Sequence, residues 1–264
     1  MKLATEKMIA EKDGPIGWMV FNNPERRNAL SVEMREAMLQ IIEDFAADDS
    51  IRVVVMKGAG DKAFVSGADI SQFEKERASD EQRQRYMALS NRVERALTTL
   101  EKPLVAMIRG YCLGGGLGVA LTADIRVAAE DAQFGIPAAR LSIGYPFEAI
   151  RKVMDLVGPS RTKDILFTAR RIAAAEALAI GLVNRVVPVP ALEDEVRAMA
   201  EGMAVNAPLT IRATKACVAE ALKDESVRDR ARCDALVDAC MAGEDYVEGR
   251  SAFMEKRPPV FKGR

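Results

Sequence analysis

The sequence contains no histidine among its 264 residues. The missing imidazole excludes Ser-His-Asp and Cys-His catalysis, and it also excludes zinc sites that depend on histidine ligands. Any catalytic chemistry must therefore come from backbone N–H groups or from carboxylate, tyrosine, serine, lysine or arginine side chains.

Other scarcities narrow the class of protein further. The 38 basic and 39 acidic residues are balanced, which gives no electrostatic basis for binding nucleic acid or an anionic membrane. No run is long and apolar enough to span a bilayer, and the N-terminus lacks a signal-peptide core. We expect a cytoplasmic protein without a metal site, whose four cysteines are reduced thiols outside any C-x-x-C pair: Cys112, Cys217, Cys233 and Cys240.

The length and the order of the predicted elements indicate an α/β protein. A chain of 264 residues with 49% hydrophobic content suits one domain, or a domain with an appended helical segment. Asp13-Gly14 separates two apolar runs and predicts a hairpin. Predicted strands and helices alternate in the first part of the chain, and most of the predicted elements from Ala138 onward are helices.

The stretch Pro103–Ala123 organises the rest of the chain. Its apolar first part predicts a buried strand and its last part a helix, so Gly114, Gly115 and Gly116 lie at a strand-to-helix turn. Glycines there let a ligand approach the backbone N–H groups, although three glycines taken alone more often reflect simple close packing than a site. No Lys-Ser/Thr follows as in a phosphate loop, and the dinucleotide fingerprint is out of register.

Five separated stretches match the pattern of one family in the expected order. They are NNPERRNALS (22–31), AFVSGADI (63–70), GYCLGGGLGVALTADIRVAAEDAQFG (110–135), EALAIGLVNRVVP (176–188) and AFMEKRPPVFKG (252–263). The chain thus resembles the crotonase superfamily, also called the enoyl-CoA hydratase/isomerase family.

This resemblance implies a fold and an assembly. The expected fold is α/β, a ClpP-like spiral of ββα turns with two nearly perpendicular sheets. Residues 1–190 would form the core that binds acyl-CoA, and residues 191–264 a helical trimerisation region. We therefore expect a homotrimer or a dimer of trimers. The substrate would be an acyl-CoA thioester, with coenzyme A entering as part of it and no separate cofactor.

The resemblance also assigns roles to residues. The backbone N–H groups of Ala68 and Gly115 match the oxyanion hole, which holds the thioester oxygen as it becomes an enolate. Phe253 and Lys256 match a tail that often reaches coenzyme A from a neighbouring subunit, but they also suit a packed phenylalanine and a solvated lysine. The full predicted substrate and coenzyme A contacts are Arg26, Arg27, Ala29, Ser66, Gly67, Asp69, Ile70, Gly114, Phe253 and Lys256.

The chain departs from typical hydratases at both acid/base positions. The two glutamates of those enzymes match Gly118 and Ala138, which cannot transfer protons. The segment around Tyr145, with residues 163–172 and 243–263, looks closest to methylmalonyl-CoA decarboxylase. Loss of CO₂ would generate the enolate directly, and Tyr145 would orient the leaving carboxylate or take part in reprotonation, unless it is simply a buried tyrosine.

We therefore expect decarboxylation of a malonyl-type acyl-CoA first, with two alternatives left open. One is an enoyl-CoA hydratase or isomerase that uses a different acid or base. Glu148 is a candidate base for isomerisation, although a glutamate in the first turn of a helix is more often solvated or stabilises the helix dipole. Asp124 suits a turn-fixing role. The other alternative is a protein that binds acyl-CoA without catalysis.

Overall fold

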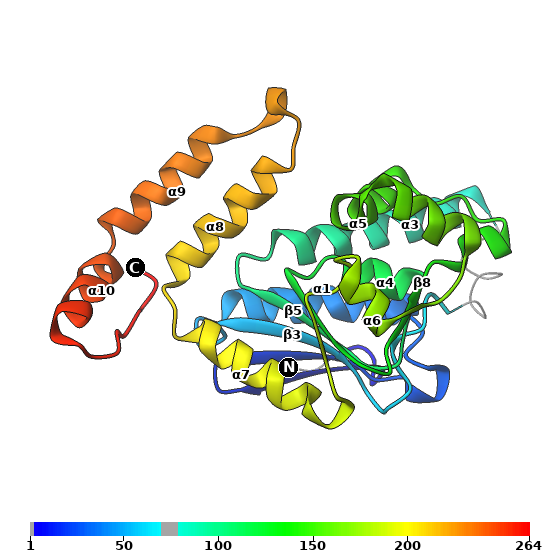
Figure 1. Cartoon of the computed structure of the whole chain (residues 1–264), viewed down its shortest axis with the longest axis horizontal. Helices are drawn as coiled ribbons and strands as arrows, with labels where there is room; N and C mark the ends of the chain where they lie inside the picture. The colour runs from blue at the N-terminus through cyan, green and yellow to red at the C-terminus, as the bar shows by residue number, and fades with distance from the viewer. Residues whose placement is uncertain (1–2, 70–78) are drawn as a thin grey trace.

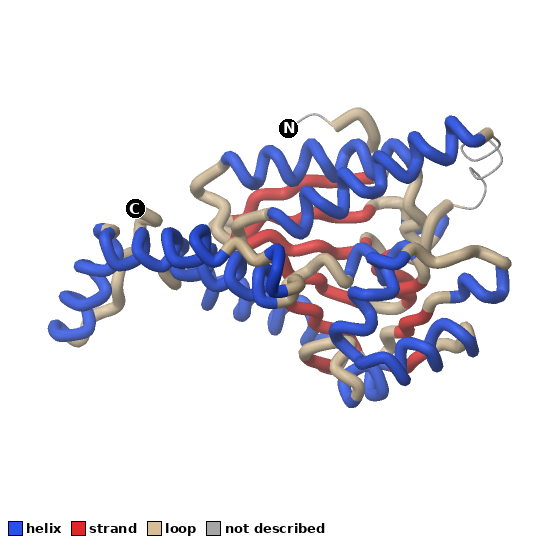
Figure 2. Tube along the Cα trace, turned by 90° about the horizontal axis from the view of Figure 1, so that it is seen from above, coloured by secondary structure: helices blue, strands red, loops and turns tan. Residues whose placement is uncertain are grey.

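The computed structural model describes residues 3–69 and 79–264 and shows an α/β core with a helical arm (Figure 1). Two sheets lie inside the core, with helices on both sides of the larger one (Figure 2). Within these described ranges, no helix has the length and apolar character needed to cross a membrane.

The larger sheet has six strands in the order β1-β2-β3-β5-β7-β10. The predicted hairpin is confirmed: β1 and β2 pair antiparallel around Gly14, whose φ of 55° favours glycine. The remaining neighbours pair in parallel. The strands are β1 (Met8–Asp13), β2 (Ile16–Phe21), β3 (Val53–Gly58), β5 (Leu104–Ile108), β7 (Ile125–Ala129) and β10 (Arg185–Val187).

The smaller sheet has four strands, β4 (Ala63–Val65), β6 (Tyr111–Leu113), β8 (Gln133–Gly135) and β9 (Ile172–Ala173). Strands β4, β6 and β8 are parallel, and β9 runs antiparallel to β8.

The short strand β6 was missed from sequence, where the apolar run of β5 was taken to lead into the glycine turn. Gly110 lies between β5 and β6 at a φ of +63°. A Cβ on Gly110 would meet the Lys62 carbonyl oxygen at 2.2 Å, so only glycine allows the chain to change sheets there. The strand that enters the turn is therefore β6.

Nine α-helices are formed by the described residues, and several begin at recognisable caps. The Ser31 hydroxyl accepts a hydrogen bond from the Met34 N–H, and Ser79 forms a capping box with Gln82. Their bounds are α1 (Val32–Ala47), α3 (Asp80–Thr99), α4 (Gly115–Ala120), α5 (Phe147–Thr168), α6 (Ala174–Ala179), α7 (Leu192–Ala204), α8 (Pro208–Ala221), α9 (Arg230–Ala242) and α10 (Glu244–Glu255).

Two apolar clusters cover the two faces of the larger sheet. The first joins α1, α3 and the smaller sheet through side chains such as Phe45 and Phe134. The second joins the opposite face to α7, where Val196 belongs to the same cluster as Trp18. Helix α7 therefore packs on the core, and the arm that extends from it in Figure 1 consists of α8, α9 and α10. The division at residue 190 and the trimer both stay predictions.

Candidate active site

The glycine turn is fixed by its backbone before any side chain is considered. The Gly114 N–H donates to the Gly135 carbonyl oxygen at 2.8 Å, which ties the turn to β8. Gly114 has φ 51° and ψ −118°, a combination that favours glycine, and α4 begins at the next residue. The turn therefore leaves the Gly115 N–H at the start of a helix, where it has no intrahelical acceptor.

Gly115 and Gly116 differ in whether the surrounding structure leaves room for a side chain. A Cβ on Gly116 would lie 2.1 Å from the Val65 carbonyl oxygen, so packing of α4 against the end of β4 requires glycine. A Cβ on Gly115 would lie 3.7 Å from the Ala68 nitrogen, an ordinary contact distance. Packing alone does not require glycine at 115, but a methyl group there would cover the Ala68 N–H.

The direction of the Ala68 N–H follows from how its neighbours are paired. Leu30 donates to the Gly67 carbonyl at 2.8 Å and accepts from the Asp69 N–H at 2.9 Å, as in a parallel bridge. In that pattern Ala68 directs its own N–H away from Leu30. Within the described part of the chain, neither this N–H nor that of Gly115 has a hydrogen-bond acceptor. Two free donors therefore lie side by side.

A buried asparagine holds the segment that carries Leu30. Asn28 is fully buried, and its amide nitrogen donates to the carbonyl oxygens of Ala59 at 3.0 Å and Ala63 at 2.8 Å. Its amide oxygen accepts from the Asn23 N–H at 2.9 Å. Asn28 thereby ties the loop before α1 to the start of β4. No role was predicted for Asn28 from the sequence, although it follows a proline in a short polar stretch typical of a turn.

The two adjacent arginines in this loop point to different partners. The Nη1 atom of Arg26 lies 3.3 Å from both carboxylate oxygens of the buried Asp69. Arg27 has a left-handed φ of 51°, and its guanidinium carbon lies 5.2 Å from the ring centroid of Tyr111. The Arg27 carbonyl accepts from the Ser66 N–H at 3.1 Å, so its backbone is joined to the loop that leads to Ala68.

Tyr145 lies next to the glycine turn as a half-buried side chain. Its hydroxyl is 3.5 Å from the Gly114 carbonyl oxygen. Burial, with the negative charge of Glu94 as a smaller cause, raises the pKa of the Tyr145 phenol to about 12. The phenol is therefore protonated at neutral pH, and it can donate a hydrogen bond but cannot act as a base.

The two positions that lack the hydratase glutamates differ in their surroundings. A Cβ on Gly118 would meet nothing within 4 Å, so open space lies one helical turn beyond Gly115. Ala138 is buried at 8% exposure.

Asp124 accepts from the Leu104 N–H at 2.7 Å and pairs with a lysine of α8, which supports the turn-fixing interpretation. Glu148 lies exposed in the first turn of α5.

Most of the predicted site residues come together around this turn, but the tail residues do not. Phe253 and Lys256 belong to α10 and its end, in the arm that extends away from the core (Figure 1). Ile70 lies outside the described residues. The residues that lie in the connected loops around the turn are Arg26, Arg27, Ala29, Ser66, Gly67, Ala68, Asp69, Gly114, Gly115 and Tyr145.

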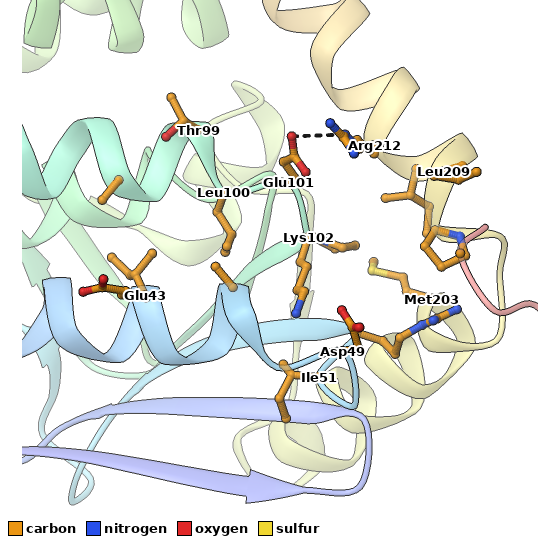
Figure 3. Close-up of a pocket in the computed structure, with 18 of the residues that line it drawn as sticks. Glu43, Asp49, Ile51, Thr99, Leu100, Glu101, Lys102, Met203, Leu209 and Arg212 are labelled. Carbon is orange, nitrogen blue, oxygen red and sulfur yellow. Dashed lines mark ion pairs between the residues drawn. The ribbon is translucent and has the colours of Figure 1, made fainter. Parts of the chain in front are cut away.

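Two cavities lie at different distances from these residues. One of about 680 Å³ opens between α1, α3 and the start of α8, where Glu101 pairs with Arg212 at 3.0 Å (Figure 3). None of the predicted site residues lines it. A smaller cavity of about 270 Å³ is lined by Arg27, Asn28 and Lys62 among others, so it adjoins the candidate site.

Solved structures define the class of fold. The chain superposes on an enoyl-CoA hydratase/carnithine racemase from Magnetospirillum magneticum with a TM-score of 0.92 and 35% identity, covering 99% of this chain and 97% of that one. An enoyl-CoA hydratase from Bacillus anthracis gives a TM-score of 0.91 and 30% identity, covering 98% and 100%. The predicted crotonase-type α/β fold is thereby confirmed.

Sequence comparison then identifies the family. The profile described as enoyl-CoA hydratase/isomerase matches residues 11–264. A putative enoyl-CoA hydratase of Thermus thermophilus is 38% identical over 258 residues, covering 96% of this chain and 100% of the relative. The short-chain-enoyl-CoA hydratase of Clostridium acetobutylicum is 36% identical over 250 residues, 95% of each chain. The chain belongs to the enoyl-CoA hydratase/isomerase family.

The names of these relatives favour one of the sequence-based expectations over another. They are hydratases, and the carnitinyl-CoA dehydratase of Citrobacter koseri, 33% identical over 267 residues, covers 98% of this chain and 100% of its own length. The special likeness to methylmalonyl-CoA decarboxylase finds no support in these comparisons. Water addition or removal therefore fits them better than decarboxylation, which was the first expectation.

Proposed function

We propose that this protein is an acyl-CoA enzyme of hydratase or isomerase type, which holds the thioester oxygen between the N–H groups of Ala68 and Gly115. The observation that carries this proposal is the pair of adjacent backbone donors without internal acceptors. Ala68 is half-buried and Gly115 is exposed, so a thioester oxygen can approach both donors from outside.

The proposed chemistry passes through an enolate of the thioester. Adding water across the double bond of an enoyl-CoA, removing it, or moving the double bond all place negative charge on the thioester oxygen. Donors that are already oriented toward that oxygen stabilise the charged state more than the neutral one, by about 3–4 kcal/mol for each donor. Gly115 supports this role because a Cβ there would lie against the second donor.

Proton transfer must use groups other than the usual glutamates. We infer that the protonated hydroxyl of Tyr145, 3.5 Å from the Gly114 carbonyl, orients the reacting water or supplies a proton beside the hole. Its raised pKa suits a donor and not a base. Glu148, exposed in the first turn of α5, is the alternative carboxylate in this segment.

Decarboxylation of a malonyl-type acyl-CoA is the second candidate, favoured by one observation. The space beside Gly118 is open and carries no carboxylate, so a carboxylate on the substrate would meet no like charge there. The enolate left after loss of CO₂ would use the same two donors.

The test is product analysis by mass spectrometry of purified protein with crotonyl-CoA, a 3-enoyl-CoA, methylmalonyl-CoA and ethylmalonyl-CoA. We expect hydration of crotonyl-CoA or isomerisation of the 3-enoyl-CoA, lost in a Gly115→Ala variant. Release of CO₂ from a malonyl substrate, with neither of those reactions, would replace the leading proposal by the second. Acyl-CoA binding without any turnover would make the protein a binding protein.

We also propose that the protein is a cytoplasmic homotrimer, or a dimer of trimers, that needs no cofactor beyond the coenzyme A of its substrate. Exposed apolar side chains on the arm support an assembly that covers them, including Val218, Val247 and Phe253. Analytical ultracentrifugation should give a mass of three or six chains, and dialysed enzyme should keep its activity. A monomer in solution would contradict the assembly.

A further inference from the structure

Two helices of the arm, α8 and α9, lie side by side and run antiparallel, joined at their outer end by residues 222–229 (Figure 1). Near this connection the buried Glu220 carboxylate accepts a hydrogen bond from the Asp229 N–H at 2.9 Å. This contact sets the register of the two helices. One turn further from the connection, Cys217 on α8 and Cys233 on α9 therefore lie opposite each other.

The pattern of burial along α9 agrees with this register. Its half-buried residues are Cys233, Leu236 and Cys240, and all its other residues are exposed. Their spacing of three and four residues places them on one face of the helix. On α8, Ala213 lies on the same face as Glu220, seven residues earlier, and it is buried and small. A small residue in a helix contact lets the two backbones approach closely, so Cys233 belongs to the interface between the helices.

The thiols of Cys217 and Cys233 are in direct contact. Partial burial of Cys233, and then a hydrogen bond between its thiol and that of Cys217, raise the pKa of Cys233 above its usual value. The other two cysteines are placed differently. Cys112 is fully buried in the core, and Cys240 lies seven residues beyond Cys233, on the order of 10 Å along the helix axis.

The surroundings of this pair favour thiol chemistry over metal binding. A metal ion needs thiolates, and the negative charges of Glu220 and Asp229 disfavour a thiolate at Cys233. Both carboxylates already have partners, because Glu220 pairs with Lys223 at 2.6 Å and Asp229 accepts from the Arg232 N–H at 2.9 Å. In residues 3–69 and 79–264, no three cysteine or carboxylate side chains are grouped to hold a metal ion. A disulfide carries no charge, so these carboxylates do not oppose it.

We propose that Cys217 and Cys233 are a peroxide-sensitive dithiol, which hydrogen peroxide converts into a disulfide that links α8 to α9. The peroxide first oxidises one sulfur to a sulfenic acid and is itself reduced to water. The second thiol then attacks that sulfur, the S–O bond breaks, and a second water leaves as the S–S bond forms. Two thiols and one hydrogen peroxide thus give one disulfide and two waters.

The disulfide closes a ring of residues 217–233 around the connection between the helices. Such a ring restricts the opened state of the helix pair more than the packed state, so it opposes local separation of α8 from α9. The site lies in the arm, outside the loops that surround Gly115, and it is independent of the proposed reaction.

The experiment counts thiols and maps the disulfide in the full chain. Protein is treated with hydrogen peroxide and denatured without reductant, and its remaining thiols are titrated. The wild type should lose two of its four thiols, and dithiothreitol should restore them. After trypsin digestion, mass spectrometry should find residues 216–223 joined to residues 233–250. Hydrogen exchange within residues 217–233 should slow about tenfold on oxidation.

Three variants serve as matched controls. Cys217→Ser and Cys233→Ser should form no disulfide within the chain, and peroxide should leave their hydrogen exchange unchanged. Cys240→Ser should still lose two thiols, because Cys240 lies on the same face of α9 but one residue pair away from the thiol contact. Circular dichroism before treatment shows whether each variant is folded, and Cys233→Ala replaces the serine variant if the hydroxyl disturbs the helix contact.

Every other result contradicts the proposal. A disulfide that includes Cys240, or one that joins two chains, would show that the register is wrong. Retention of all four thiols at a peroxide concentration that oxidises free glutathione would show that the two sulfur atoms cannot meet. Unchanged hydrogen exchange in the oxidised protein would show that the bond does not restrain the helices. Binding of Zn²⁺ that is lost in Cys217→Ser, without disulfide formation in the wild type, would make the pair a metal site instead.

Discussion

Two halves of the candidate active site differ in how the fold determines them. The half proposed to bind the oxygen is set by backbone contacts, from the Gly114–Gly135 hydrogen bond to the close approach of Gly116 and Val65. The half that would handle protons has open space at Gly118 and no glutamate at either usual position. The backbone of the fold therefore fixes the position of the two proposed donors, whereas the proposed proton chemistry depends on side chains that can change without disturbing the backbone.

The largest effect on activity should come from covering the Ala68 N–H, one of the two proposed donors. Gly115→Ala places a methyl group 3.7 Å from the Ala68 nitrogen, so the chain folds but the thioester oxygen is displaced. We expect kcat/KM to fall roughly 10²–10³-fold while the melting temperature changes little. Steady-state kinetics and calorimetry on the same sample measure both quantities. Unchanged turnover would show that the oxygen binds elsewhere.

Gly116→Ala should instead damage the fold. Its Cβ would lie 2.1 Å from the Val65 carbonyl oxygen, and a backbone atom cannot move aside as a flexible side chain can. We expect the free energy of unfolding to fall by about 3 kcal/mol. Urea denaturation followed by circular dichroism gives this value, with Gly144→Ala as a control because a Cβ there meets nothing within 4 Å. Equal stability of the two variants would remove the distinction drawn between Gly115 and Gly116.

Adding a carboxylate at Gly118, in the half that lacks glutamates, should increase activity where the preceding substitutions decrease activity or stability. A Cβ at Gly118 meets nothing within 4 Å, so we expect Gly118→Glu to keep the fold. We expect hydration of crotonyl-CoA to rise about tenfold, because a positioned carboxylate supplies acid/base catalysis. Gly118→Gln has nearly the same size without the charge and should give no rise. A rise in both variants would mean that packing, and not proton transfer, limits the rate.

An effect of similar size and opposite sign should come from Tyr145→Phe. Turnover near pH 7 should fall about tenfold with little change in KM, if the hydroxyl donates near the hole. Because the folded pKa of about 12 lies above the unfolded value near 10, the folded protein keeps a proton that the unfolded chain releases. The wild type should therefore lose stability, on the order of 1–2 kcal/mol, as pH rises from 10 toward 12.

The Tyr145→Phe variant has no such hydroxyl and should lack this part of the loss. Urea titrations of both proteins at pH 9, 10.5 and 11.5 measure the difference, and the other three tyrosines are present in both proteins. Parallel loss in the two proteins would place the Tyr145 phenol in contact with solvent.

The features that could be predicted from the sequence are those determined by residues close together in the chain. The Asp13-Gly14 hairpin and the glycine turn were found because turn residues and apolar periodicity identify them directly. Resemblance to a family supplied Ala68, which nothing in its immediate sequence distinguishes. The special likeness to a decarboxylase rested on Tyr145 and short flanking segments, and the whole-chain comparisons favour hydratases instead.

Other features depended on contacts between distant segments. Arg171 meets Tyr111 only because β6, β8 and β9 are neighbours in one sheet, and pairing of that kind is not encoded in any short stretch. The different roles of Gly115 and Gly116 follow from distances to Ala68 and Val65, which lie some fifty residues earlier. The strand β6 was missed because it is short and only Arg109 and Gly110 separate it from β5.

The contact between Gly116 and Val65 has a practical consequence for protein engineering. It sets α4 against the end of β4 through main-chain atoms, so the spacing of the two donors does not depend on the side chains around them. Libraries that vary residues 118, 138 and 145 can therefore explore new acyl groups and new proton donors on an unchanged catalytic frame. The backbone around Gly116 and Val65 can therefore be kept unchanged while the surrounding side chains are selected for new reactions.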